Sequence, residues 1–264
     1  MAEAADSSTQ QRRGSAIKPD DRERGDTRHY WRVGIAVWII GFVVLVIVSM
    51  IVHAHPRPWP FELDVTKLLQ GPRPVPCNYR VVPHLWLDQA SDLLNQMNDP
   101  LPSLVVPLVI MAGLALFRLF WQALFVGVAA LGSSTIWGGI NFLVGRPRMT
   151  PAVGVCVHRV VTVYSFPSGH VMHDVVFYGF LLYLTFSKPL REWRYRWIIY
   201  PLQVLLVLYM LAIGYTRLEA GEHMLVDVLG AYLAGILCLV LCIWLYRWTL
   251  HLWAEHRAKS VTHA

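Results

Sequence analysis

Six apolar runs, separated by polar segments, constrain the fold of this chain more than any other feature of its sequence. Most of them approach or exceed the roughly 20 residues that a helix needs to cross the hydrocarbon core of a bilayer. Hydrophobic residues make up 55% of the 264 residues and charged residues only 15%, whereas soluble domains carry about 25% charged residues. We therefore expect an all-α membrane protein, a six-transmembrane-helix bundle. The predicted spans are residues 33–52, 103–117, 119–144, 171–186, 197–215 and 226–246.

The polar segments divide the chain around this bundle. Residues 1–29 are predicted to form a disordered cytoplasmic tail, residues 30–250 the six-helix domain, and residues 251–264 a cytoplasmic C-terminal tail. The first apolar run begins late and is long enough to span, so no cleavable signal peptide is expected. Two short amphipathic helices are predicted within residues 61–69 and 86–97, in the outer loop between the first two spans. They either lie on the membrane surface or pack against the bundle.

Lysine and arginine are unevenly distributed between the two sides of the predicted membrane. Alternating spans place the N-terminal tail, residues 187–196 and the C-terminal tail on one side, and these segments carry most of the basic residues. Segments rich in Lys and Arg usually face the cytoplasm. We therefore expect a multi-pass plasma membrane protein with cytoplasmic N- and C-termini. The same bias accounts for the net charge of +6, so a nucleic-acid partner is not expected.

A polar stretch at residues 215–227 interrupts the apolar pattern between the last two spans. It contains Arg217, His223 and Asp227, and ionisable groups at this depth usually line a cavity or a reaction site. His223 and Asp227 are four residues apart, so a helix would place both on one face. A carboxylate behind an imidazole fixes its tautomer and orientation, as a nucleophilic histidine requires. A salt bridge at a helix end is the alternative interpretation.

Two upstream segments join this stretch on the outer side of the predicted membrane. One runs from Asn141 to Arg148 and includes Arg146, and the other runs from Ser165 to His170 just before the fourth span. Guanidinium groups match phosphate oxygens bidentately, and free backbone N–H groups at a helix start point toward an anion. Together the three segments predict a site for a tetrahedral anion on the extracytoplasmic face.

Two of these segments resemble motifs of the type-2 phosphatidic acid phosphatase superfamily, the membrane lipid phosphate phosphatases. The family pattern is KX6RP, then PSGH, then SRX5HX3D. PSGH is complete as Pro167-Ser168-Gly169-His170. The third motif is matched by Arg217, His223 and Asp227 at the family spacing, with Thr216 in place of Ser. The similarity in motif order and helix count covers roughly residues 30–250.

The first motif departs from the family pattern. Arg148 matches, but Asn141 stands where the family has Lys, and Met149 where it has Pro. Asn141 can donate a hydrogen bond but carries no charge, so we expect one cationic contact to phosphate to be missing. Arg146, two residues before Arg148, is the candidate substitute. Glu219 and Glu222 add negative charge beside the site, which would oppose a phosphate dianion unless their side chains point away.

The resemblance implies a role for each matched residue. His223 would attack phosphorus and form a phosphohistidine, with Asp227 holding its other nitrogen, while His170 would protonate the leaving oxygen. The phosphate oxygens would be held by Arg148, Arg217, Ser168 and Gly169. The family needs no metal, and no cofactor is expected. The implied partners are a lipid phosphate substrate and membrane lipids.

Three functions follow from these residues. The first is hydrolysis of a lipid phosphate or diphosphate, with phosphatidic acid, phosphatidylglycerophosphate and polyprenyl diphosphates as candidate substrates. The second is lipid phosphotransfer, and the third is a non-catalytic membrane protein that binds anionic lipids, which Asn141 in place of Lys would favour. The sequence predicts no oligomeric state.

Two smaller hypotheses concern residues near the site. Asp174 lies one turn after His170 and either orients a site residue or is a solvated helix-end carboxylate. Cys77 and Cys156 both fall in predicted outer loops, where they either form a disulfide or remain thiols.

Overall fold

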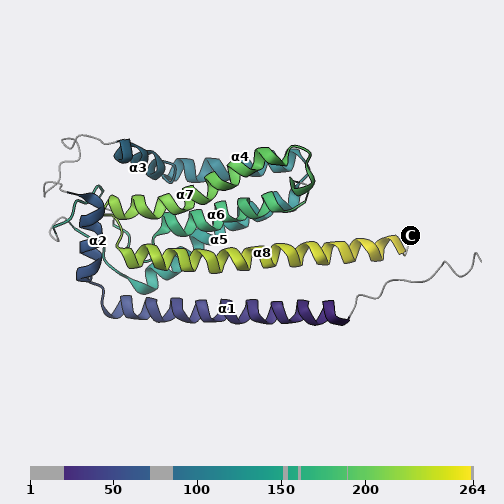
Figure 1. Cartoon of the computed structure of the whole chain (residues 1–264), viewed down its shortest axis with the longest axis horizontal. Helices are drawn as coiled ribbons and strands as arrows, with labels where there is room; N and C mark the ends of the chain where they lie inside the picture. Colours follow the sequence, from purple (N-terminus) through teal and green to yellow (C-terminus); the bar gives the residue numbers. More distant parts are fainter. Residues whose placement is uncertain (1–20, 72–85, 151–153, 160–161, 189, 263–264) are drawn as a thin grey trace, which may run out of the picture. The chain divides into compact units, whose positions relative to one another are not determined.

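The computed structural model describes residues 21–71, 86–150, 154–159, 162–188 and 190–262, and these contain helices and no β-strand. The chain divides into two compact units, Met1–Gly41 and Phe42–Ala264, and every described residue of the candidate site belongs to the second. The helices labelled in Figure 1 are α1 (Asp21–Ala54), α2 (Pro60–Gln70), α3 (Trp86–Gln96), α4 (Pro100–Leu116), α5 (Phe120–Val144), α6 (Gly169–Phe186), α7 (Ile199–Glu219) and α8 (Leu225–Thr262). Two 3-10 turns, Leu190–Glu192 and Arg196–Ile198, lie between α6 and α7.

All six predicted spans are helical, but several helices extend beyond the predicted limits, and α1, α7 and α8 extend furthest. α1 begins at Asp21, within the predicted N-terminal tail, of which residues 1–20 lie outside the described residues. α7 continues to Glu219, so Arg217 lies in its last turn. α8 continues to Thr262 and includes most of the predicted C-terminal tail. Helix hydrogen bonds need no apolar residues, and good helix formers such as Ala, Glu, Arg and Lys continue the helix beyond the apolar run.

Four helical segments are long and apolar enough to cross a membrane: Trp31–Ala54, Phe120–Val144, Arg196–Glu219 and Leu225–Ser260. A fifth crossing results if Gln89–Gln96 and Pro100–Leu116, which meet at 63°, form one broken span. The described chain therefore holds four or five candidate spans where six were predicted. α4 alone has only 17 residues, and polar side chains in the first turns of α6 lower its hydropathy.

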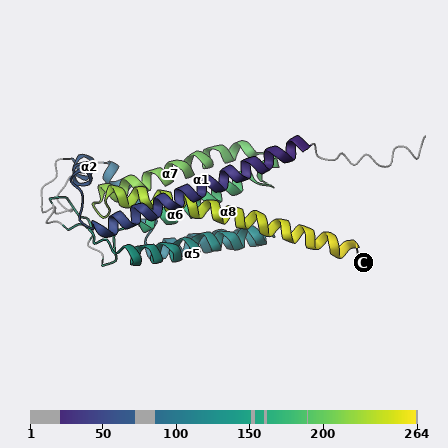
Figure 2. The ribbon, with the colours of Figure 1, turned by 90° about the horizontal axis from the view of Figure 1, so that it is seen from below.

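Helix α6 is the central element of the second unit, in contact with α5, α7 and α8 (Figures 1 and 2). Phe125 of α5, Phe180 of α6 and Tyr246 of α8 form an aromatic cluster with ring centroids 5.3 to 6.3 Å apart. Within a membrane such packing stabilises through close van der Waals contact, because lipid tails are as apolar as the side chains. This packing determines where the first turn of α6 lies.

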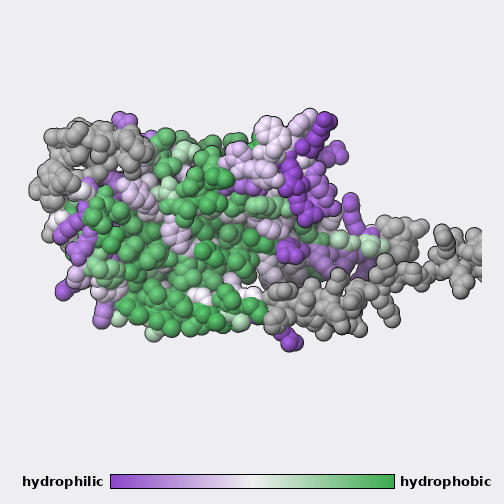
Figure 3. Space-filling model, in the orientation of Figure 1, coloured by the Kyte–Doolittle hydropathy of each residue, from purple (hydrophilic) through white to green (hydrophobic). Residues whose placement is uncertain are grey.

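Helices α2 and α3 turn polar faces toward the rest of the second unit. On α2, Glu62 and Gln70 are buried while Leu68 is 80% exposed, and on α3, Ser91 is buried while Leu93 is 61% exposed. Figure 3 shows apolar residues over the middle of the bundle and hydrophilic residues gathered near the α6–α7 connection. An apolar outer face suits a helix at a lipid interface, and the location of α2 and α3 at a membrane surface stays a prediction.

Gln70, the last residue of α2, joins this helix to the loop at Cys156 and to the last residue of α7. Its Nε2 donates to the carbonyls of Cys156 at 2.6 Å and Glu219 at 2.8 Å. A Cβ on Gly221, where φ is +63°, would lie 2.0 Å from the Cys156 carbonyl oxygen, so this turn requires glycine. Cys156 is disulfide-bonded, and Cys77, its predicted partner, lies outside the described residues.

Candidate active site

Four helix ends meet at one end of the second unit (Figure 1). α5 and α7 end there, and α6 and α8 begin there. The last turns of α5 and α7 carry Asn141 and Arg217, and the first turns of α6 and α8 carry His170 and Asp227. The fold therefore brings the three predicted motif segments together.

His223 lies in the short connection between α7 and α8 and is 1% exposed. Its Nδ1 is 2.9 Å from the carbonyl oxygen of Ser165. Because a carbonyl oxygen can only accept, Nδ1 carries the proton, and the lone pair of Nε2 faces Nη1 of Arg148 at 3.3 Å. Burial lowers the pKa of His223 to about 4, and the nearby Asp227 only partly offsets it. The ring is therefore neutral near pH 7, with Nε2 available as a nucleophile.

Asp227 is fully buried and holds His223 less directly than predicted. Its Oδ2 is 3.9 Å from Nδ1 of His223, which is too far for a hydrogen bond. The carboxylate instead accepts from the Ser165 hydroxyl, from the Met224 N–H at 2.9 Å and from Arg146 at 2.7 Å. Asp227 thus positions Ser165, whose carbonyl holds the imidazole. At 3.9 Å it still stabilises positive charge on the ring.

Arg146 is fully buried between two carboxylates. Its guanidinium forks onto Glu62 of α2 at 2.6 and 3.2 Å and reaches Asp227 at 2.7 Å. Its guanidinium carbon also lies 5.0 Å from the ring centre of Trp59. Burial lowers the pKa of Arg146, but Asp227 and Glu62 outweigh that effect and raise it. The proposed substitution for the family Lys is therefore not what Arg146 does: it links α2 to the site carboxylate.

Asn141 also differs from its predicted role as a substrate contact. It is 5% exposed, and its amide nitrogen donates to the carbonyls of Tyr164 and Phe166, both at 3.0 Å. A side-chain amide has two donor hydrogens, so both are used by the protein. Asn141 holds the backbone immediately before Pro167 and organises the loop that leads into α6.

The start of α6 has fewer free backbone N–H groups than the predicted anion site assumed. The Ser168 N–H donates to the Asp227 carbonyl at 3.1 Å, so it is not free for an anion. Gly169 and His170 are the first helical residues, whose backbone N–H groups have no acceptor within the helix. A Cβ at Gly169 would lie 2.9 Å from the indole of Trp137, which donates to the Pro167 carbonyl at 2.9 Å. Glycine therefore allows this close packing.

The two predicted phosphate-binding arginines are held by different groups. Nη1 of Arg148 donates to the Glu222 carbonyl at 3.0 Å and lies 3.3 Å from Nε2 of His223. Burial lowers the pKa of Arg148 below its ordinary value. Arg217 is fully buried, with Nη1 donating to Oδ1 of Asn95 at 2.8 Å and Nη2 in contact with the Glu222 carboxylate.

Several buried polar atoms at the site lack a protein partner. In the described part of the chain, Oγ of Ser168, Nε2 of His170 and the Nε atoms of Arg217 and Arg146 are buried and make no hydrogen bond. Buried polar groups are normally paired, and leaving one unpaired costs about 1–3 kcal/mol. The other nitrogens of Arg146 are paired with Glu62 and Asp227, whereas the first three atoms belong to residues predicted to act on a phosphate. Their arrangement indicates a polar ligand.

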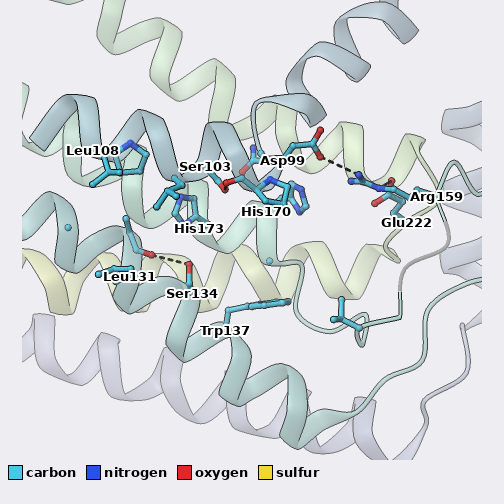
Figure 4. Close-up of a pocket in the computed structure, with 18 of the residues that line it drawn as sticks. Asp99, Ser103, Leu108, Leu131, Ser134, Trp137, Arg159, His170, His173 and Glu222 are labelled. Atoms are coloured by element: carbon cyan, nitrogen blue, oxygen red, sulfur yellow. Dashed lines mark hydrogen bonds and ion pairs between the residues drawn. The ribbon is translucent and has the colours of Figure 1, made fainter.

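A cavity of about 850 Å³ opens beside His170, the one of these three residues that lines it (Figure 4). Its polar end is lined by Arg148, Arg159, His170 and Glu222, and apolar residues of α4 and α5 line the remainder. The apolar lining includes Leu104, Leu108, Met111 and Leu131.

Asp174, a candidate to orient His170, instead accepts from the Asn98 amide at 2.8 Å. No group of three or more His, Cys, Asp or Glu within the described residues is arranged to hold a metal ion.

Five residues of this network were not predicted as site residues: Glu62, Asn95, Arg159, Ser165 and Glu222. Ser165 lies two residues before the PSGH motif, and Glu222 directly precedes His223, so proximity to a motif is a usable signal for both. No spacing rule connects Glu62 to Arg146 or Asn95 to Arg217, which are 84 and 122 residues apart in the chain.

Comparison with known proteins agrees with this geometry. The fold is similar to the crystal structure of the first transmembrane PAP2-type phosphatidylglycerolphosphate phosphatase from Bacillus subtilis, with a TM-score of 0.61 and 17% sequence identity over 78% of this chain and 93% of that chain. At this identity the likeness shows the fold alone. No curated protein sequence matches significantly. The model of the PAP2 superfamily matches residues 119–250, which contain all three motif segments, and the chain is therefore a multi-pass membrane protein that belongs to the PAP2 superfamily.

Proposed function

We propose that this protein removes phosphate from a lipid monophosphate or diphosphate through a phosphohistidine intermediate. The observation that carries this proposal is the group of unpartnered atoms on Ser168, His170 and Arg217, in a site where the unprotonated Nε2 of His223 faces Nη1 of Arg148, a predicted phosphate-binding arginine, at 3.3 Å. Membership of the PAP2 superfamily supports a phosphatase acting at a membrane.

In the first step, the Nε2 lone pair of His223 attacks phosphorus as the bond from phosphorus to the ester oxygen breaks. His170, in its imidazolium form, gives its Nε2 proton to that oxygen and becomes neutral, and the alcohol leaves. The phosphorylated ring keeps its Nδ1 proton and becomes positively charged, which the Ser165 carbonyl at 2.9 Å and Asp227 at 3.9 Å stabilise. Arg148 and Arg217 hold the non-bridging oxygens as negative charge shifts onto them.

In the second step, water attacks the phosphohistidine. His170, now without its proton, takes one from the water as the phosphorus–nitrogen bond breaks. Inorganic phosphate leaves, and His223 and His170 return to their starting protonation states. Atoms and protons balance over the two steps.

A lipid substrate is supported by the shape of the cavity. From its polar end at His170, the cavity continues along α4 to Met111, about 16 Å from Pro100 at 1.5 Å rise per residue. Leu104, Leu108 and Leu131 of its lining are 58%, 52% and 71% exposed, so protein does not enclose this part. An acyl or prenyl chain fits there with its phosphate beside His170.

The membrane arrangement follows the distribution of Lys and Arg. Six crossings with cytoplasmic termini would put the four converging helix ends at the outer boundary of the plasma membrane. A headgroup phosphate lies at this depth while its chains stay in hydrocarbon. Phosphatidylglycerophosphate is the first substrate to try, because the structurally similar protein from Bacillus subtilis is named for it.

The test measures phosphate release from phosphatidylglycerophosphate, phosphatidic acid and a polyprenyl diphosphate in mixed micelles. His223→Ala is expected to lower kcat by on the order of a thousandfold or more, as removal of a nucleophile does. His55→Ala, an exposed histidine of the same unit, is the matched control and should keep full activity. Wild-type-like turnover by His223→Ala would refute the proposal. Phosphate release that requires an added alcohol acceptor would indicate a phosphotransferase.

A further inference from the structure

A carboxylate of the protein itself lies where the site would hold an anion. Glu222 is 6% exposed and directly precedes His223. Its Oε2 contacts Nη2 of Arg217, and its Oε1 lies 3.9 Å from Nε of Arg159. Glu222 therefore bridges two guanidinium groups at the polar end of the cavity (Figure 4).

Arg159 lies outside the three family motifs, in the loop between the first and the second. Its side chain is 52% exposed, and Nη1 is 3.2 Å from Asp99. Figure 4 shows Arg159, Asp99 and His170 around the same cavity. Asn141 carries no charge and is used by the backbone, so Arg159 supplies a positive charge at a site where the family Lys is missing.

The charges at the polar end explain why the position of Glu222 matters. Arg148 and Arg159 line the cavity and Arg217 contacts Glu222, which gives three positive charges against the two negative charges of Glu222 and Asp99. With Glu222 in place the sum is one positive charge, and without Glu222 it is two. The two positive charges of the site without Glu222 match a phosphate dianion. Opposite charges at short range favour phosphate binding, whereas an adjacent carboxylate opposes phosphate binding.

We propose that Arg159 is an additional phosphate-binding residue and that Glu222 is a displaceable carboxylate, which phosphate replaces on Arg159 and Arg217. The proposal rests on the proposed function only for the place where phosphate binds. Glu222 acts through the two arginines and is a positioning residue. When phosphate leaves, the carboxylate returns to them, so it weakens the binding of the product and speeds its release.

The experiment measures inorganic phosphate binding to the detergent-solubilised full chain by calorimetry at pH 7, without turnover. Glu222→Gln is expected to tighten the Kd for phosphate about tenfold, which is about 1.4 kcal/mol. Arg159→Gln is expected to weaken it about tenfold. Asp64→Asn and Arg57→Gln make the same charge changes at exposed residues of the same unit and should leave the Kd unchanged.

Two further variants keep the proposal open to refutation. Glu222→Asp retains the charge but shortens the side chain, so it should bridge the arginines less well and give an intermediate Kd. In the double variant of Glu222→Gln and Arg159→Gln, the gain from Glu222→Gln should shrink. In turnover, Glu222→Gln should lower KM without raising kcat.

If Glu222→Gln bound phosphate with a Kd equal to or higher than that of the wild type, the proposal that phosphate displaces Glu222 would be refuted. An Arg159→Gln variant that binds phosphate like Arg57→Gln would overturn the role of Arg159. Phosphate binding needs no turnover, so a wild type that binds phosphate but hydrolyses no lipid refutes the proposed function alone.

Discussion

Replacing Arg146 by Gln is expected to destabilise the protein strongly, because it leaves two buried carboxylates without their cation. The side chains of Arg146, Glu62 and Asp227 are all 0% exposed, and the two ion pairs measure 2.6 and 2.7 Å. One charge pair at about 4 Å is worth about 4 kcal/mol at an effective dielectric constant near 20, before desolvation is counted.

Removing one partner of a buried ion pair typically costs about 3–5 kcal/mol. Here two carboxylates lose the same partner, so we expect the upper end, about 5 kcal/mol. For a chain of this length that loss lowers Tm by on the order of 10 °C. The measurement is thermal unfolding of the detergent-solubilised protein, with Arg57→Gln as an exposed control expected to stay within about 0.5 kcal/mol of the wild type.

A double-mutant cycle with Glu62→Gln separates this ion network from general damage. Adding Glu62→Gln to Arg146→Gln removes one of the two unpaired carboxylates, so the double variant should recover about 2 kcal/mol relative to Arg146→Gln alone. The reasoning from buried charge would be wrong if the free energy of unfolding of Arg146→Gln were within about 1 kcal/mol of that of the wild type. It would also be wrong if the double variant were less stable than Arg146→Gln by the full cost of Glu62→Gln alone.

Two further predictions concern His223 and Asn141. Because burial lowers the pKa of His223 to about 4, the loss of kcat/KM from its protonation should occur near pH 4, and a His223-dependent loss centred near pH 6.5 would contradict this. In the unfolded chain His223 binds a proton below about pH 6.5, whereas in the folded protein it does so only below about pH 4. The unfolded state therefore binds more protons between about pH 6.5 and about pH 4, and Tm should fall as pH is lowered through this range. The fall should be smaller in His223→Gln. Asn141→Asp removes both donors to Tyr164 and Phe166 and should cost about 2 kcal/mol or more in thermal unfolding. Asn141→Lys should fail to raise kcat/KM, and an increase would show that position 141 contacts phosphate after all.

The sequence by itself determined the helices and the motif segments. Apolar runs and their polar boundaries are local properties, so all six predicted spans are helical, although only four or five of the described segments are long and apolar enough to cross a membrane. Motif order at helix ends was sufficient to predict that residues 141–148, 165–170 and 217–227 would meet. Hydropathy also separated the polar and apolar faces of α2 and α3, although it did not predict that the polar faces would be buried against the site.

Only the tertiary structure decided what each polar side chain binds. Arg146 and Asn141 stand at or beside a phosphate-binding motif, yet one pairs with Glu62 from α2 and the other with loop carbonyls. Glu62 itself lies outside the residues that the family model matches. The physical reason is that apolar burial depends on the composition of a segment, whereas a hydrogen bond or ion pair depends on which distant atoms come within about 3 Å. Local pattern therefore predicted the helices, and packing between distant segments selected the partners of each charge.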